Sequence, residues 1–316
     1  MLRQRLENFF SDGGEKCSGK TRKVKSLLGE VEISQKQAKK LGVRPKTGIS
    51  PALEKCCLRI CAKTSYRQSE EDLWMLMRVK ISHSTLHRLV QRTDILPLQE
   101  ENSNQKISGV SIDGGKICLR GGEKEGSQWR DYKLVSLHQG GNEAFFQDSE
   151  GLQKWSNRQN LASIITFHGD GHPGIWNIIE EFDSQQWLIR RQILGWYHMK
   201  EHLYKVGGSL KRLKAVENLL WHGFIEAAIR QFEGLKSKKF HKFIDYLNKH
   251  HSRIPDYHTY HKLGIPIGSD DVESRIKQVA ARVKISGARW NPKNVPRILR
   301  LRCAYLNRSP SLSISN

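Results

Sequence analysis

Apolar positions recur at a helical spacing between residues 50 and 92 of this chain. They fall three or four residues apart in three successive groups: Leu53, Cys57, Ile60 and Cys61; Leu73, Leu76 and Met77; and Leu86, Leu89 and Val90. Such spacing predicts three amphipathic helices. Ser50 followed by Pro51 marks the start of the first helix, and the capping-box pattern from Ser69 to Asp72 marks the start of the second.

From residue 107 the pattern changes to that of strands. Alternating or continuous apolar runs predict five strands, over residues 109–113, 116–120, 132–138, 163–167 and 192–197, with helices over 143–160 and 174–182. Residues 198–264 return to helical spacing. A further helix is expected after Ser269, which would cap it, and a last helix is expected after Asn291-Pro292. A short strand pair around Gly29 is expected over residues 22–33.

The charge of the chain narrows the choice of partner. Lys and Arg total 53 against 32 acidic residues, which gives a net charge of +21. Such a field attracts polyanions, and nucleic acid is the most direct partner because each neutralised phosphate releases counterions. Simple solubility is the alternative reading. The chain has neither a long apolar run nor a secretory signal, so we expect no membrane partner, a cytoplasmic location and reduced cysteines.

The second and third predicted helices, separated by a break over residues 79–82, fit a helix-turn-helix. In that motif the later helix enters the major groove of DNA. Its polar face is basic and rich in hydrogen-bonding groups, and its candidate DNA contacts are Ser84, Thr85, His87, Arg88, Gln91 and Arg92. A generic three-helix bundle is the alternative.

The elements together predict a mixed α/β fold. From residue 107 onward their order is that of an RNase H-like catalytic core, interrupted by an all-α insertion and preceded by the helix-turn-helix domain. The expected domains are a DNA-binding region over 1–95 with the motif at about 50–92, a linker over 96–106, the first part of the core over 107–197, the insertion over 198–264, C-terminal helices of the core over 265–308, and a tail over 309–316.

Three acidic residues stand where this order would bring them together. Asp113 ends the first predicted strand, Asp170 follows the fourth, and Glu273 lies on the late helix. Carboxylates supply the hard oxygen ligands that Mg²⁺ requires, and a pair of ions can assist both attack and departure in phosphoryl transfer. Singly, each residue has a structural alternative, because Asp-Gly is a turn signal and Glu273 with Lys277 is an ordinary surface pair.

Residues 109–307 resemble the DDE transposases of bacterial insertion sequences, most closely the ISKra-type family. The resemblance is carried by VSIDGGK around Asp113, WRDYK at 129–133, HGDG around Asp170 with Trp176 after it, WYHMKEHLYKVGGSLKRLK at 196–214, IGSDDVESRIKQVAARVKISGARW at 267–290, and RCAYLNR. The first hundred residues match the family's N-terminal DNA-binding region more loosely.

The resemblance implies a bacterial, nucleoid-associated transposase that cleaves DNA at element ends with water and joins the freed 3′ hydroxyl to target DNA. Asp113, Asp170 and Glu273 would be catalytic and would bind two Mg²⁺ or Mn²⁺ ions, and the protein would act as a homo-oligomer on DNA. His198 matches the histidine of the family's Asp-x-x-His motif, which implies a catalytic-site role. Gly195 replaces the aspartate of that motif and Asp270 replaces a glycine, so the activity of this copy stays open.

Basic and aromatic residues follow Glu273 along the chain. They are Lys277, Arg282, Lys284, Arg289 and Trp290. Such side chains suit phosphate contacts and base stacking, so we expect them to bind DNA near the scissile bond. A solvated basic face is the alternative.

Two other classes of protein fit parts of the chain. Residues 14–21 match the phosphate-binding pattern G-x4-G-K-T, which would indicate a P-loop ATPase accessory to transposition. Such a loop must follow a buried strand and open a helix, and the segment before Lys20 is no such strand. A non-catalytic helix-turn-helix DNA-binding protein is the other alternative, and it leaves the three spaced acids unexplained.

Overall fold

The computed structural model describes residues 20–45, 47–98, 106–121, 126–182, 188–268 and 270–313. The chain divides into two compact units, Met1–Leu96 with Ala281–Asn316, and Pro97–Ala280. Residues from 281 onward, expected among the C-terminal helices of the core, therefore belong to the same unit as the N-terminal region. Within the described residues, no helix has both the length and the apolar character that crossing a membrane would need.

The first unit begins with a hairpin. Strand β1 (Thr21–Ser26) pairs antiparallel with β2 (Gly29–Ser34), and Gly29 turns the chain with a φ of +108°. Helix α2 (Gln35–Lys40) follows directly, because Ser34 and Gln37 form a reciprocal capping box. The strand pair predicted around Gly29 is confirmed.

Three helices then pack around one apolar core: α3 (Pro51–Cys61), α4 (Tyr66–Met77) and α5 (His83–Arg92). The Ser50 cap is confirmed, since its hydroxyl accepts from the backbone N–H of Leu53. The predicted start of α4 at Ser69 is wrong. The capping box is formed by Ser65 and Gln68, one turn earlier, and Ser69 is buried with its hydroxyl bonded to the Ser65 carbonyl.

The end of the chain completes this unit with η2 (Pro292–Asn294), α14 (Val295–Leu306) and η3 (Pro310–Leu312). Two buried arginines close the last turn of α3. Arg282 Nε donates to the Cys61 carbonyl at 2.6 Å, and Arg302 Nη1 donates to the Ala62 carbonyl at 3.0 Å. The last carbonyls of a helix have no partner within it, so these guanidinium groups satisfy acceptors that would otherwise be buried unpaired.

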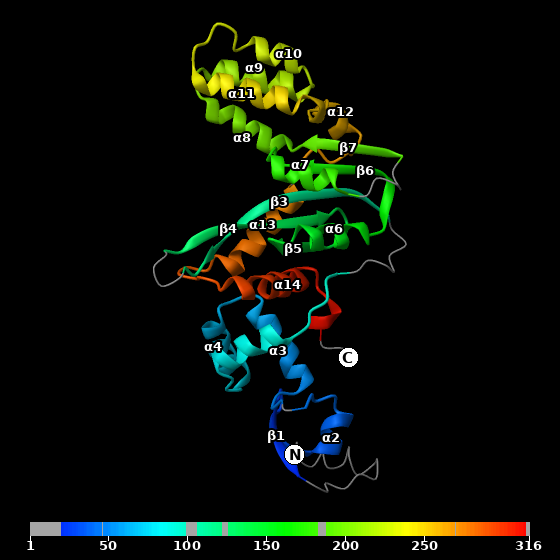
Figure 1. Ribbon diagram of the computed structural model, residues 1–316, viewed down its shortest axis with the longest axis vertical. Helices are drawn as coiled ribbons and strands as arrows, with labels where there is room; N and C mark the ends of the chain where they lie inside the picture. The colour runs from blue at the N-terminus through cyan, green and yellow to red at the C-terminus, as the bar shows by residue number, and fades with distance from the viewer. Residues whose placement is uncertain are drawn as a thin grey trace. The chain divides into compact units, whose positions relative to one another are not determined.

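The second unit is built on a five-stranded sheet in the order β5-β4-β3-β6-β7 (Figure 1). Its strands are β3 (Ile107–Leu119), β4 (Gln128–Leu137), β5 (Asn142–Phe146), β6 (Leu161–Gly169) and β7 (Ile189–Leu194). The first three pair antiparallel, whereas β6 is parallel to β3 and β7 is parallel to β6. The central strand is therefore β3, the first in chain order.

One strand prediction and one helix prediction are wrong. Residues 109–113 and 116–120 form one strand rather than two, because β3 runs through Gly114 and Gly115 without turning. Gly115 is needed for packing: a Cβ there would lie 2.2 Å from Cζ of the buried Tyr132 across the ladder. The helix predicted over 143–160 instead begins as the edge strand β5, and helix α6 (Ser149–Asn157) follows it.

Helices connect and extend this sheet. Helix α7 (Pro173–Glu180) joins β6 to β7, and beyond β7 the chain is helical, as predicted for 198–264 (Figure 1). The insertion consists of α8 (Trp196–Val206), α9 (Leu210–Trp221), α10 (Ile225–Arg230), α11 (Lys238–Lys249), η1 (His251–Arg253) and α12 (Tyr257–Lys262). Its apolar residues continue the sheet core, since Leu203, Leu220 and Leu247 belong to the same buried cluster as Ile112 and Phe167.

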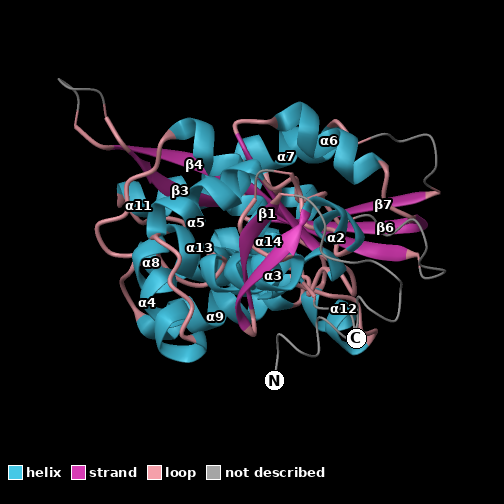
Figure 2. Cartoon of the chain, turned by 90° about the horizontal axis from the view of Figure 1, so that it is seen from below, coloured by secondary structure: helices cyan, strands magenta, loops and turns pink. Residues whose placement is uncertain are grey.

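Helix α13 (Asp270–Val283) carries Glu273, the third acid of the predicted site, and is labelled in Figure 2. Ser269, its predicted cap, lies outside the described residues, as does the side chain of Asp270. The apolar residues Val272, Val279 and Val283 of this helix are all fully buried.

Candidate functional site

The sheet brings Asp113 and Asp170 to neighbouring positions. Strands β3 and β6 run parallel with Ser111 opposite His168, so two more residues along each strand lead to Asp113 and Asp170. Asp113 is 9% exposed within β3, whereas Asp170 is half-buried in the turn that follows β6. Their juxtaposition is a consequence of strand register.

Two backbone hydrogen bonds bring the later segments to the same edge. The N–H of Gly195, between β7 and α8, donates to the Gly169 carbonyl at 3.0 Å. The N–H of Trp196 donates to the Ile267 carbonyl, also at 3.0 Å, and Ile267 lies just before α13. The first turns of α8 and α13 therefore start next to the residue that precedes Asp170.

His198 and Glu273 meet as a result. The His198 Nε2 lies 3.1 Å from Glu273 Oε1, with side chains 20% and 28% exposed. An imidazole at that distance holds the carboxylate by an ion pair when protonated. Helix α8 thus contributes a residue that orients the acid of α13, across 75 positions of sequence, from 198 to 273.

The four side chains share one electrostatic environment. Burial raises the pKa of Asp113, and repulsion from the negative charges of Asp170 and Glu273 raises it further. A hydrogen bond from the Gly114 N–H and the nearby His198 act in the opposite direction and lower it. Like charges raise the pKa of a carboxyl only when they are close, so Asp170 and Glu273 both lie within electrostatic range of Asp113.

Each acid also has a local partner that orients it. Asp113 Oδ1 accepts from the Gly114 N–H at 2.6 Å, and Asp170 Oδ1 accepts from the His172 N–H at 2.8 Å. The donor set of three carboxylates suits Mg²⁺ or Mn²⁺ chemically, since hard cations take oxygen ligands. Among the residues the structure describes, however, no three His, Cys, Asp or Glu side chains are already arranged to hold a metal ion.

Comparisons with known proteins identify no family for this chain. Neither the protein-family models nor the curated proteins contain a match to this chain. The interpretation of the site therefore rests on its own chemistry.

The predicted DNA-contacting face of α5 divides into two parts. Ser84, Arg88 and Arg92 are exposed, and the guanidinium of Arg88 bonds back to the Ser84 carbonyl and the Thr85 hydroxyl. His87 and Gln91 are half-buried, and the His87 ring packs edge-on against Tyr66 at 5.3 Å. Only the exposed part, with the half-buried Thr85 beside it, presents groups to a ligand.

The start of α5 is capped by a neighbouring helix. Glu70 of α4 accepts from the backbone N–H of His83 at 2.7 Å and lies 2.9 Å from its Nδ1. These hydrogen bonds lower the pKa of Glu70, and its negative charge complements the positive end of the helix dipole. The turn between α4 and α5, with Arg78 in the left-handed region at φ 55°, is held in this way.

Two residues predicted to bind DNA after Glu273 are placed elsewhere. Arg282 is 1% exposed, with its guanidinium over the rings of Tyr66 and Trp290 at 5.3 Å and 5.2 Å. Trp290 is itself buried and donates from its indole to the Val283 carbonyl at 2.8 Å. Neither side chain therefore offers an exposed surface to DNA in this structure. Lys277, Lys284 and Arg289 are exposed.

The described part of the segment predicted as a P-loop leads into a strand rather than a helix. Residues 14–19 lie outside the described residues, but Lys20 is followed at once by Thr21, the first residue of β1. A phosphate-binding loop opens a helix at this point, and its lysine and threonine stand at the start of that helix. The strand pairing of Thr21 with Ser34 leaves no such helix.

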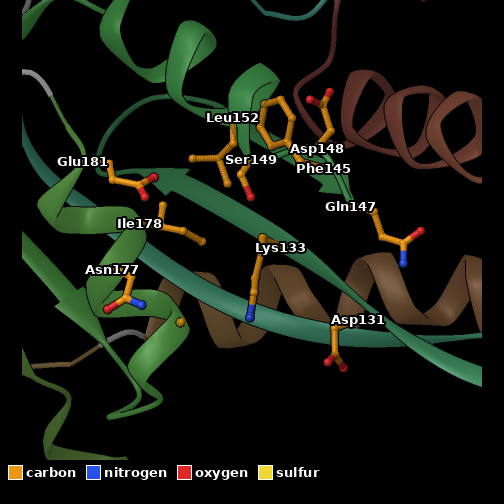
Figure 3. A pocket seen from close by; sticks show the side chains of 11 residues that line it. Asp131, Lys133, Phe145, Gln147, Asp148, Ser149, Leu152, Asn177, Ile178 and Glu181 are labelled. Carbon is orange, nitrogen blue, oxygen red and sulfur yellow. The ribbon is translucent and has the colours of Figure 1, made fainter.

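A separate pocket of about 330 Å³ lies on the other face of the sheet (Figure 3). It is lined by Asp131, Lys133, Phe145, Gln147, Asp148, Ser149, Leu152, Gly174, Asn177, Ile178 and Glu181. Lys133 pairs with Gly114 in the ladder, and successive side chains of a strand point to opposite faces, so Asp113 faces away from this pocket. The pocket therefore does not contain the carboxylates.

Two residues of the insertion lie near Asp170 and were not among the predicted site residues. Tyr246 of α11 and His202 of α8 both respond to the charge of Asp170. His202 lies within the 196–214 stretch that carries the family resemblance but was assigned no role, and Tyr246 is 76 positions beyond Asp170, from 170 to 246. Only the packing of α11 reveals their position.

Proposed function

We propose that this protein is a DDE-type transposase that cleaves DNA and transfers the cleaved strand. The observation that carries the proposal is the gathering of Asp113, Asp170 and Glu273 with His198 at one edge of the sheet. Their mutual effect on the pKa of Asp113 and the 3.1 Å approach of His198 to Glu273 support it. Three acids drawn from a strand, a loop and a distant helix have no structural need to converge, because like charges repel.

The strand order supports an RNase H-like core as the frame of this site. Numbered by appearance in the second unit, the strands lie in the order third, second, first, fourth, fifth. The first strand is central and carries Asp113, while Asp170 follows the fourth. That is the placement of acids expected from such a core, and the helical block between Asp170 and Glu273 corresponds to its insertion.

The carboxylates have distinct parts in the proposed chemistry. Asp113 and Asp170, adjacent in the sheet, would hold divalent cations through their oxygens, and Glu273 would complete the ligand set. Bound Mg²⁺ or Mn²⁺ would supply Lewis-acid stabilisation of the phosphate and a more acidic attacking water. His198 keeps the Glu273 carboxylate directed at the edge of the sheet where the other two acids lie.

Positive charge would bring DNA to this edge. Lys277 is exposed one turn beyond Glu273 on α13, where its ammonium group would be available to a DNA phosphate. Exposed Arg88 and Arg92 on α5 provide a second contact in the other unit, as in a helix-turn-helix. A homo-oligomer on DNA, with two element ends brought together, follows from the proposed reaction.

The test is metal-dependent nicking of supercoiled plasmid by the full chain. With Mg²⁺ or Mn²⁺ we expect nicks, and Asp113→Asn, Asp170→Asn and Glu273→Gln should each reduce the rate by at least about 10²-fold while DNA affinity is retained. Asp131→Asn, on the opposite face of the sheet, is the matched control and should nick normally. Nicking that survives all three substitutions would refute the proposal.

A non-catalytic DNA-binding protein is the second candidate. It is favoured by one observation, that the three acids are not already arranged to hold a metal within the described residues. It would bind DNA through α5 and show no nicking with any divalent ion. The same plasmid assay, paired with a gel-shift measurement, separates the two candidates.

A further inference from the structure

The turn that carries Asp170 lies directly against helix α11 of the insertion. Gly171 adopts a φ of +87°, and a Cβ added to it would lie 2.8 Å from Oη and 2.9 Å from Cε2 of Tyr246. On the sheet side, the same Cβ would lie 3.2 Å from Cδ1 of Leu194. The backbone after Asp170 is thus confined between β7 and the ring of Tyr246, and only glycine combines that conformation with that space.

Tyr246 is in turn held by two histidine rings. His202 of α8 stacks on it with ring centroids 4.4 Å apart and planes at 13°. His250, one turn further along α11, meets it edge-on at 4.9 Å and is fully buried. The ring therefore has a fixed position that two helices of the insertion define together.

The hydroxyl of Tyr246 also lies near the Asp170 turn. It is buried, and within the described residues it makes no hydrogen bond. Burial raises the pKa of Tyr246, and the negative charge of Asp170 raises it further, so the hydroxyl and the carboxylate are near each other. Within the described residues, the ring is therefore held by packing against His202, His250 and the Gly171 turn rather than by a hydrogen bond of its hydroxyl.

We propose that Tyr246, braced by His202, is a positioning residue that fixes the Asp170–Gly171 turn from the side of the insertion. The helical insertion is then a structural part of the carboxylate site rather than an appended domain. The inference rests on the proposed function for the role of Asp170 and adds the residues that keep it in place. Tyr246 itself touches no reacting atom.

Hydrogen exchange measured by mass spectrometry tests this without requiring activity. The backbone N–H of His172 is bonded to Asp170 Oδ1, so its exchange reports directly on the turn. In Tyr246→Ala we expect peptides covering residues 169–174 to exchange at least about tenfold faster, with other sheet peptides unchanged. Tyr246→Phe keeps the ring and should keep the protection. Tyr204→Phe is the control on α8, because it removes the hydrogen bond from the Tyr204 hydroxyl to Glu217 of α9.

Kinetics of plasmid nicking provide the second readout. Tyr246→Ala should lower kcat about tenfold or more at saturating DNA, with the Kd for DNA and the unfolding temperature little changed. If Tyr246→Ala fails to fold, His202→Ala removes the brace from its exposed side and should give a smaller increase in exchange over 169–174.

The outcomes separate the two proposals. Faster exchange over 169–174 in Tyr246→Ala, together with a wild-type protein that does not nick DNA, would keep the positioning role and reject the transposase. Unchanged exchange over 169–174 in a folded Tyr246→Ala protein would overturn the positioning role. Faster exchange throughout the sheet, accompanied by a lower unfolding temperature, would also overturn it, because Tyr246 would then stabilise the fold in general.

Discussion

His198 places its Nε2 3.1 Å from Oε1 of Glu273, and this pair joins the first turn of α8 to the first turns of α13. When protonated, the imidazole pairs with a carboxylate whose negative charge also raises the pKa of Asp113. The pair is therefore the structural link between the insertion and the acid that follows it in the chain.

Substitution of His198 should impair catalysis more than folding. In His198→Ala the Glu273 carboxylate loses its orienting partner, and we expect nicking to fall about 10- to 100-fold, the usual cost of losing a residue that orients a ligand. His198→Gln can still hydrogen-bond the carboxylate and should fall less. Plasmid nicking measures the loss of catalysis, and thermal unfolding of the same variants measures any loss of stability. His241→Ala, a substitution of an exposed histidine, is the control. Equal nicking by wild type and His198→Ala would show that the pair has no catalytic role.

Arg282 should contribute to stability rather than to DNA binding. Its guanidinium is 1% exposed, bonded to the Cys61 carbonyl and stacked with two aromatic rings. Arg282→Ala removes these interactions and leaves a buried carbonyl unpaired, so we expect the free energy of unfolding to fall by about 2–4 kcal/mol. Urea unfolding measures the change, and an unfolding curve like that of wild type would contradict it.

Arg88 provides the contrasting case on the exposed face of α5. Among the described residues its side chain bonds only within its own helix, so Arg88→Ala should change stability by no more than about 0.5 kcal/mol. If α5 binds DNA, affinity should fall and the slope of log K against log salt should decrease by about one. Fluorescence anisotropy over a salt series tests this. An unchanged affinity and slope would remove α5 from the DNA interface.

The two glycines after Asp113 should differ sharply in tolerance. A Cβ on Gly115 would meet Cζ of the buried Tyr132 at 2.2 Å, whereas one on Gly114 would meet only the flexible end of Lys133 at 3.3 Å. We expect Gly115→Ala to lower the free energy of unfolding by about 1–3 kcal/mol, as overpacking does, and Gly114→Ala to have little effect. Urea unfolding of both variants compares them, and equal stabilities would indicate that the ladder can shift.

Stability should fall in mild acid through His250. Its ring is fully buried, and burial lowers its pKa to about 4, below the value of about 6.5 in an unfolded chain. Between those values the unfolded state binds a proton that the folded state does not. The free energy of unfolding should therefore decline as pH falls from about 6.5 to about 4, by at most about 1.4 kcal/mol per pH unit.

A pair of adjacent histidines isolates this contribution. His250→Gln should flatten the decline measured by urea unfolding between pH 7 and 5, whereas His251→Gln, whose side chain is 56% exposed, should not. Identical pH profiles for wild type and His250→Gln would mean that other groups control the acid sensitivity.

Local signals in the sequence predicted most elements. Apolar spacing indicated the helices α3 to α5, the strand β6 and the helical insertion, and the Ser50-Pro51 pair located the start of α3. The failures also had local causes. Gly114-Gly115 resembles a turn but continues a strand, since glycine there serves the packing of Tyr132 across the ladder. The sequence predicts a helix from residue 143, where β5 (Asn142–Phe146) lies, because a short buried edge strand has no periodicity of its own.

The sequence by itself identified the candidate residues for the proposed chemistry: Asp113, Asp170 and Glu273 are acids in positions that strand and helix order relate to one another. Only the tertiary structure decided what surrounds them. Strand register placed Asp113 beside Asp170, two backbone bonds brought α8 and α13 together so that His198 faces Glu273, and α11 laid Tyr246 against Gly171. The burial of Arg282 and Trp290 was likewise invisible, because periodicity reports which face of a helix is apolar but not when a cation and an aromatic ring bury each other. Contacts between residues far apart in the chain depend on packing, which leaves no periodic trace in the sequence.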